Sequence, residues 1–241
     1  MEWITSAEGW AALLTLAVLE IVLGIDNIIF IALLAGKLPA DQRERARRTG
    51  LFLAMFIRIG LLLSIAWVMG LTAPLVTLLG RGLTGRDLIL LGGGLFLIFK
   101  STQEIHDKLE GAEHGASTPR GGSSFVAVIA QILALDIVFS IDSVITAVGM
   151  AEHLEIMIGA VVIAILVMMV AAGPVADFIH RNPTVKMLGL SFLLLIGVAL
   201  VADAAHFHIP RAYIYFAIAF SSLVEALNTV AAKRRTKRKK I

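Results

Sequence analysis

Long apolar runs that carry almost no charge are the feature that most restricts how this chain can fold. Each run approaches or exceeds the roughly 20 apolar residues that a helix needs to cross a membrane, and none sustains the alternation of a strand. With 58% of its residues hydrophobic and 16% charged, the chain also lacks the charged surface of a soluble domain. The runs cover residues 9–36, 50–69, 88–101, 125–150, 156–172, 185–202 and 212–232. We therefore expect an all-α polytopic membrane protein with about seven transmembrane helices and no strands.

Basic residues are distributed unequally between the two sets of loops. Seventeen of the 21 Lys and Arg residues follow the first, third, fifth and seventh runs, three lie in the other loops, and Arg58 lies inside the second run. The positive-inside rule then predicts an N-terminus outside and a C-terminus in the cytoplasm, in a bacterial-type inner (plasma) membrane. We interpret the basic tail as a topology and anionic-lipid anchor rather than a nucleic-acid arm. Glu2 and Glu8 replace the basic start of a cleavable signal peptide, so the first run is expected to remain.

An acidic motif occurs in two of the runs. Glu20 and Asp26 lie six residues apart in the first run, and Asp136 and Asp142 repeat that spacing in the fourth. The residues between the two acids are also similar in character in both copies. The amide of Asn27, directly after the first copy, aligns with the hydroxyl of Ser143 after the second. Because the predicted topology makes these runs enter the membrane from opposite sides, the two copies are antiparallel. Inverted repeats of this kind are typical of secondary transporters, whose site lies near the membrane midplane.

The repeat suggests how the chain is divided. The polar, Gly- and Ser-rich residues 108–124 read as a cytoplasmic linker between two halves. The fifth run is expected to end at Gly173 and Pro174, a pair that terminates helices. The predicted organisation is a three-helix repeat (1–107), the linker (108–124), an inverted three-helix repeat (125–210), a seventh helix (211–232) and a basic tail (233–241).

Carboxylates inside apolar runs are expensive and therefore informative. An aspartate at the centre of a membrane helix costs about 2.5–3.5 kcal/mol, so four unpaired acids facing lipid would cost roughly 10–14 kcal/mol. Arg58 and Lys100 are the basic residues that we consider as partners for these acids, and two cations cannot neutralise four acids together with Glu225. We expect the acids to face the interior and to meet cations or protons. The alternative is that they pair with Arg58 and Lys100 and only lock helices together.

Helix geometry limits how these acids can share an ion. Six helical residues span about 9 Å, whereas metal–oxygen bonds are about 2.0–2.6 Å, so a regular helix does not easily place both acids of one copy on one ion. Either the helices break near Gly24 and Ser140, or the two copies share an ion. We predict local unwinding at both positions. Carboxylate, amide and hydroxyl oxygens suit Mn²⁺, Ca²⁺ and Mg²⁺, and the absence of Cys argues against copper(I) and a thiolate zinc site.

Secondary pathway candidates lie outside the two motifs. Lys100 and Glu104, at the end of the third run, either gate a pathway or rest at the interface. Glu225 and Asn228 form an i,i+3 pair in the seventh run, and either line the cavity or pair with Arg58. Both alternatives stay open at this point.

The whole chain before the basic tail resembles the TerC family of integral membrane proteins. The resemblance rests on the two motifs and on three further stretches: Gly92–Lys100 leading into Gln103 and Glu104, His208–Pro210 followed by Tyr213–Ala217, and Ser221–Asn228. The family is named for tellurium resistance, and the activity best attached to it is manganese export. The resemblance implies that the cation is bound by Glu20, Asp26, Asn27, Asp136, Asp142 and Ser143.

Together these observations favour a transporter that exports a divalent cation, foremost Mn²⁺, by alternating access, with proton coupling as an extension. The alternative is a membrane scaffold of a tellurite- or stress-resistance complex without transport. An enzyme is not expected, because the aspartate motifs lack the flanking residues of intramembrane proteases. No resident cofactor is expected. The expected partners are a divalent metal ion and the lipid bilayer, with no nucleic acid and with a homo-oligomer left open.

Overall fold

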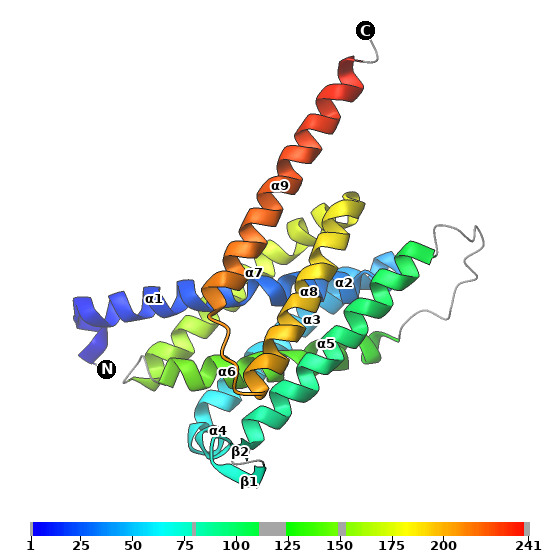
Figure 1. Cartoon of the computed structure of the whole chain (residues 1–241). Helices are drawn as coiled ribbons and strands as arrows, with labels where there is room; N and C mark the ends of the chain where they lie inside the picture. The colour runs from blue at the N-terminus through cyan, green and yellow to red at the C-terminus, as the bar shows by residue number, and fades with distance from the viewer. Residues whose placement is uncertain (1, 79–80, 111–123, 149–152, 239–241) are drawn as a thin grey trace.

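Helices account for almost all of the computed structural model, which describes residues 2–78, 81–110, 124–148 and 153–238 (Figure 1). A short 3₁₀ turn, Glu2–Thr5, precedes them. The helices are α1 (Ala7–Leu23), α2 (Ile25–Ala35), α3 (Ala40–Leu63), α4 (Ile65–Gly70), α5 (Gly85–Glu110), α6 (Phe125–Val148), α7 (Leu154–Arg181), α8 (Pro183–Ala204) and α9 (Arg211–Arg238). Five segments of the described chain are long and apolar enough to span a membrane, namely Ala7–Ala35, Gly85–Glu110, Phe125–Ile145, Leu154–Arg181 and Pro183–Ala204. An α-helical polytopic fold is therefore confirmed, with most of the predicted runs in their expected places.

Two expectations about secondary structure outside the acidic motifs are wrong. A short antiparallel hairpin, β1 (Pro74–Leu78) with β2 (Arg81–Thr84), lies between α4 and α5. β-Branched residues such as Val76 and Thr77 favour extended backbone there. The fifth run also does not end at Pro174, because α7 continues through it to Arg181. Pro174 is exposed, and membrane helices tolerate proline because local adjustments satisfy the freed backbone carbonyl.

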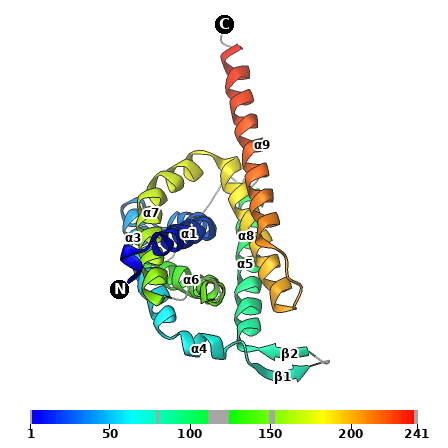
Figure 2. The same cartoon turned by 90° about the vertical axis from the view of Figure 1, so that its left-hand side faces the viewer.

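The helices are arranged in two groups that are visible in Figure 2. In the first group α1 packs against α7, and α3 packs against both α6 and α7. In the second group α5 and α8 run side by side over their length. Helix α9 contacts α8 and then extends beyond the rest of the molecule (Figures 1 and 2).

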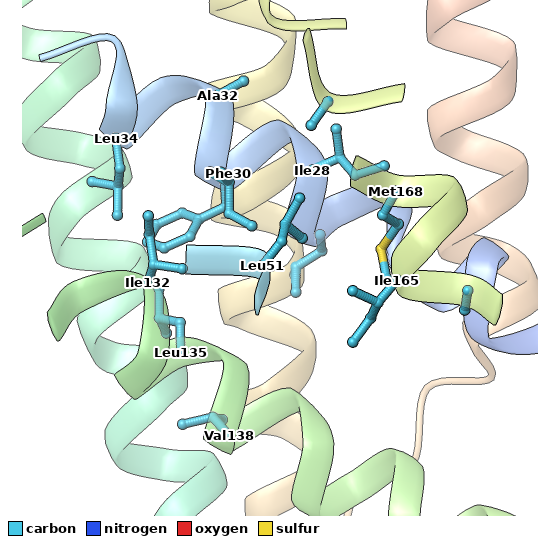
Figure 3. Close-up of a cluster of buried hydrophobic side chains, with 14 of the residues drawn as sticks. Ile28, Phe30, Ala32, Leu34, Leu51, Ile132, Leu135, Val138, Ile165 and Met168 are labelled. Carbon is cyan, nitrogen blue, oxygen red and sulfur yellow. The ribbon is translucent and has the colours of Figure 1, made fainter. Parts of the chain in front are cut away.

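The core of the first group is closely packed and apolar. Figure 3 shows Ile28 and Phe30 of α2 beside Leu51 of α3 and Ile132 and Leu135 of α6, all of them buried. Burying such side chains contributes about 1.5–3 kcal/mol each in water. In a bilayer that gain is small, so close packing and interior polar bonds hold the helices together.

The backbones of helices α5 and α8 approach each other closely at two glycines. A Cβ atom added at Gly94 would lie 2.7 Å from the carbonyl oxygen of Gly197, and one added at Gly197 would lie 2.9 Å from that of Gly94. Backbone atoms cannot give way as the tip of a flexible side chain can. These positions therefore require glycine if the two helices are to keep this distance.

Replacing Gly94 by alanine is expected to separate α5 from α8. We expect Gly94→Ala to lower the stability of the detergent-purified protein by about 1–3 kcal/mol, the usual range for overpacking. Gly92→Ala is the matched control, because a Cβ atom at Gly92 meets nothing within 4 Å. Thermal unfolding of both variants checks the prediction, and equal melting temperatures would contradict it.

The two ends of the bundle are joined by different polar contacts. At one end, which we call the basic end, Lys37 after α2 forms an ion pair with Glu104 of α5, and Arg45 of α3 lies over the ring of Phe125 at the start of α6. At the opposite end, His206 after α8 lies 3.4 Å from the carboxylate of Asp87 near the start of α5. The chain thus passes back and forth between two distinct ends.

Candidate functional site

A buried arginine joins the two copies of the acidic motif. Arg58, in the last third of α3, binds Glu20 of α1 through Nη1 and Asp136 of α6 through Nη2, 2.9 Å from Oδ1. Its Nε donates to the same Asp136 oxygen at 3.2 Å. Arg58, Glu20 and Asp136 are 3%, 9% and 6% exposed, so all three charges lie inside the bundle. We call these three residues the Arg58 cluster.

The Arg58 cluster carries an excess of negative charge. Two carboxylates share one guanidinium, and the second oxygen of Asp136 accepts a hydrogen bond from Ser140 at 3.3 Å. Buried charges are stable only when paired and hydrogen-bonded, and this arrangement supplies both. The locking role that the sequence left as an alternative is therefore visible for Arg58, Glu20 and Asp136.

A small cavity borders the cluster. It measures about 20 Å³, enough for one water-sized group, and its polar lining comes from Glu20, Arg58 and Ser143. The remaining walls are apolar and come from α1, α3, α6 and α7. Ser143 donates its hydroxyl hydrogen to the carbonyl of Ser140 at 3.2 Å, as is common within helices. Three of the predicted site residues, one basic and two from the acidic motifs, therefore line one cavity.

The local backbone differs between the two copies. Helix α1 ends at Leu23 and α2 begins at Ile25, so the predicted interruption at Gly24 is present. A Cβ atom at Gly24 would lie 2.5 Å from Met168 Sδ, which shows how closely α7 crosses there. The predicted interruption at Ser140 is wrong, because α6 runs unbroken from Phe125 to Val148. Serine is a better helix former than glycine, and Ser140 adds a hydrogen bond to Asp136 within the same helix.

Asp26 is not one of the ion-pair partners of Arg58, although it lies near enough for its charge to act on that guanidinium. Asp26 is half-buried, accepts a hydrogen bond from the backbone N–H of Asn27 at 3.0 Å, and lines a cavity of about 280 Å³ with Tyr215 and apolar residues of α8 and α9. A second cavity, of about 30 Å³, is lined by both Asp26 and Asp203. Asn27 is 6% exposed, and its side-chain nitrogen has no hydrogen-bond partner among the described residues.

Asp142 also has a separate location. It forms an ion pair with Arg86, the second residue of α5. In the topology predicted from the sequence Arg86 lies in a loop, so the sequence did not predict this ion pair. The sequence offered a weak indication: Arg86 is one of three basic residues in the loops of the predicted outer side, and it lies two residues before an apolar run.

The four motif acids therefore do not share one location. Within the part of the chain that the structure describes, no group of three or more His, Asp or Glu side chains is close enough to hold a metal ion. Glu20 and Asp136, one acid from each copy, meet at Arg58. The axial separation of about 9 Å that a helix puts between the two acids of one copy agrees with this division.

The secondary candidates divide into two places. Lys100 and Glu104 line a cavity at the basic end, and Glu104 is paired with Lys37. Glu225 is half-buried and Asn228 is exposed on α9, and neither belongs to the described lining of the cavity beside Arg58. Arg58 instead takes Glu20 and Asp136 as its partners.

A bundle of apolar helices with paired charges in its interior defines a polytopic membrane protein with a polar centre. The sequence model of a protein family, described as the Integral membrane protein TerC family, matches residues 5–240. The chain therefore belongs to that family. It is 56% identical over 227 residues to a UPF0053 protein of Haemophilus influenzae, covering 94% of this chain and 96% of that protein.

Two relatives from Escherichia coli show the same likeness at different lengths. The UPF0053 inner membrane protein YgdQ is 56% identical over 232 residues, covering 96% of this chain and 97% of that protein. The UPF0053 inner membrane protein YoaE is 52% identical over 233 residues, which is 97% of this chain but 45% of that protein. No solved structure matches this chain.

Proposed function

We propose that this protein is an inner-membrane transporter that exports a divalent metal cation, foremost Mn²⁺, by alternating access. The observation that carries the proposal is the Arg58 cluster, in which one carboxylate from each acidic motif meets at a single buried cation. Carboxylates this deep in a membrane protein commonly mark an ion pathway. Oxygen ligands of this kind suit Mn²⁺ and Mg²⁺ better than softer metals.

In this proposal Arg58 is a tethered cation that competes with the transported one. Its guanidinium holds Glu20 and Asp136 together while the carrier is empty, so that neither carboxylate is left buried and unpaired. An incoming divalent cation brings enough charge to balance both carboxylates and releases Arg58 from them. Asp26, Asn27, Asp142 and Ser143 would complete the pathway on either side of the cluster. Protons that replace the cation on these carboxylates would couple export to a proton gradient.

The inverted repeat is part of the same proposal. It is supported by reciprocal packing, since α1 packs against α7 as α6 packs against α3, and α5 packs against its counterpart α8. It implies seven spans, with α3 and α4 as the second and α9 as the seventh, and the division into residues 1–107, 125–210 and 211–232. Most of the proposed linker lies outside the described residues. The basic end would face the cytoplasm, with the N-terminus outside.

Transport into inverted membrane vesicles tests the proposed function. We expect wild-type protein to accumulate Mn²⁺ and Asp136→Asn to reduce the initial rate at least about tenfold, because about 1.4 kcal/mol of lost binding corresponds to a factor of ten. Glu155→Gln is the matched control, since Glu155 is an exposed acid on α7. Equal rates for Asp136→Asn and Glu155→Gln, at equal amounts of folded protein, would refute transport through this site.

The scaffold alternative is favoured by one observation, the locking of α1, α3 and α6 by the Arg58 cluster. It predicts that wild-type protein moves no cation. It also predicts that deleting residues 233–241 abolishes stress resistance, because the basic tail would dock the partners. In the transporter proposal the same deletion leaves Mn²⁺ flux in vesicles unchanged.

A further inference from the structure

Three cavities lie in a row along α2 and α8, which belong to the two different groups of helices. The cavity at the basic end, of about 20 Å³, is bordered by Leu34 of α2 and Leu190 of α8. The next, of about 280 Å³, is bordered by Asp26 and Ile196, and the third, of about 30 Å³, by the same two residues and by Asp203. From one cavity to the next the lining residues move back along α2 and forward along α8. The row therefore leads from the basic end of the bundle to the opposite end.

Neighbouring cavities in this row share wall residues. Leu193 lines both the first and the second cavity, and Asp26, Ile196 and Tyr215 line both the second and the third. Movements of these shared side chains would join the cavities. The middle cavity has room for several waters, and Asp26 adds a carboxylate to its otherwise largely apolar wall. Small divalent cations bind through one or two carboxylates while they keep several of their waters, and the middle cavity offers both.

The third cavity lies close to solvent at the end opposite the basic end. Asp203, at its border, lies 3.2 Å from Nδ1 of His208, whose side chain is 77% exposed. In the proposed orientation this end faces outward, so a cation that follows the row would leave beside Asp203.

The ion pair of Lys37 with Glu104 lies at the basic end of the row. Both side chains line the first cavity, and they come from the two groups of helices, since Lys37 follows α2 and Glu104 belongs to α5. They are 27% and 24% exposed, so the pair is in contact with both the cavity and solvent. Behind the pair, Ser101 is 2% exposed, and its hydroxyl has no hydrogen-bond partner among the residues described. A buried hydroxyl normally has a partner, so Ser101 indicates a small polar occupant of this cavity.

We propose that the Lys37–Glu104 ion pair is the cytoplasmic gate of a cation route that follows α2 and α8 to Asp26. The inference rests on the proposed function and deepens it, because it names where the cation enters. Lys37 occupies the carboxylate of Glu104 as Arg58 occupies those of Glu20 and Asp136. A divalent cation that takes Glu104 from Lys37 would release α5 from the end of α2 and open the first cavity.

The charge of Lys100 does not prevent this entry. Lys100 also lines the first cavity, but its ammonium lies 5.8 Å from the centre of the Phe99 ring, and Phe99 is exposed. Its charge is therefore directed toward the surface of the bundle. A cation bound to Glu104 would meet the hydroxyl of Ser101 on its inner side.

Labelling of a thiol placed behind the ion pair tests the gate. The chain contains no cysteine, so Ser101→Cys introduces a single thiol into the first cavity. In inverted vesicles, Glu104→Gln should raise the rate at which a membrane-impermeant methanethiosulfonate ammonium reagent modifies this thiol about fivefold, the effect of losing one partly exposed ion pair. Lys37→Gln should act in the same direction, although it changes the local charge in the opposite sense.

Glu44→Gln is the matched control for labelling. Glu44 is an exposed acid at the same end whose ion pairs, with Arg47 and Arg48, lie within α3 and join no two helices. Its loss should leave the labelling rate of Ser101→Cys unchanged. If Glu104→Gln and Lys37→Gln label Ser101→Cys no faster than Glu44→Gln does, the ion pair is not a gate.

The modified thiol also tests the route. A reagent attached at Ser101→Cys fills the first cavity, so it should stop Mn²⁺ accumulation in inverted vesicles, and a reductant that removes it should restore accumulation to the level of the unmodified variant. Thr184→Cys, exposed at the start of α8, should be modified readily without loss of transport. Transport that survives full modification of Ser101→Cys, yet is lost in Asp136→Asn, overturns the route and keeps the proposed function. A wild-type protein that moves no Mn²⁺ refutes the proposed function itself.

Discussion

Arg58→Gln is expected to destabilise the protein by about 3–5 kcal/mol, the cost of leaving a buried charge without its partner. The substitution removes the guanidinium from between Glu20 and Asp136 and leaves two carboxylates inside the bundle. Their mutual repulsion adds to the cost of burial. Thermal or denaturant unfolding in detergent, together with the yield of monodisperse protein, measures the effect.

Two control variants test whether the loss of stability comes from the unpaired carboxylates. Glu20→Gln leaves the bond between Arg58 and Asp136 in place, so it should cost much less than Arg58→Gln. Arg48→Gln removes a cation whose side chain is 73% exposed and which pairs with Glu44, so it should cost at most about 1 kcal/mol. If Arg58→Gln were as mild as Arg48→Gln, the Arg58 cluster would not hold these helices together.

The triple variant Glu20→Leu, Arg58→Met, Asp136→Val should fold and yet not transport. Replacing a whole buried ion cluster by well-packed hydrophobic residues of similar volume is often neutral or stabilising by about 1–4 kcal/mol, because no charge is left to desolvate. Its melting temperature should therefore equal or exceed that of wild type. Without the two carboxylates, Mn²⁺ accumulation in inverted vesicles should fall at least about tenfold.

This variant separates the binding role of the cluster from its structural role. A folded triple variant that transports at the wild-type rate would exclude Glu20 and Asp136 as cation ligands. A triple variant as unstable as Arg58→Gln would show that the loss of charge pairing does not explain the instability of the single variant. Reconstitution at matched protein density ensures that the Mn²⁺ transport rate is measured independently of the melting temperature.

The sequence predicts the structure correctly where neighbouring residues alone decide whether a helix forms. Apolar runs and proline or glycine positions predicted most helices, and the interruption at Gly24 follows from the weak helix preference of glycine. The same reasoning failed at Ser140 and Pro174, where the surrounding helix supports the residue. The pairing of β1 (Pro74–Leu78) with β2 (Arg81–Thr84) was not predicted, because the alternation of apolar and polar residues in these strands is too short to stand out beside long apolar helices.

The sequence by itself determined that the chain is an α-helical membrane protein and that carboxylates recur at one spacing inside its apolar runs. The cost of burying charge guaranteed that these acids would seek partners. Only the tertiary structure decided which partners they found. Arg58 reaches Glu20 across 38 residues of chain and Asp136 across 78, while Arg86 reaches Asp142 across 56. Periodicity describes one helix at a time, whereas these pairings depend on where α3 and α5 cross α1 and α6, and crossings are set by packing between distant segments.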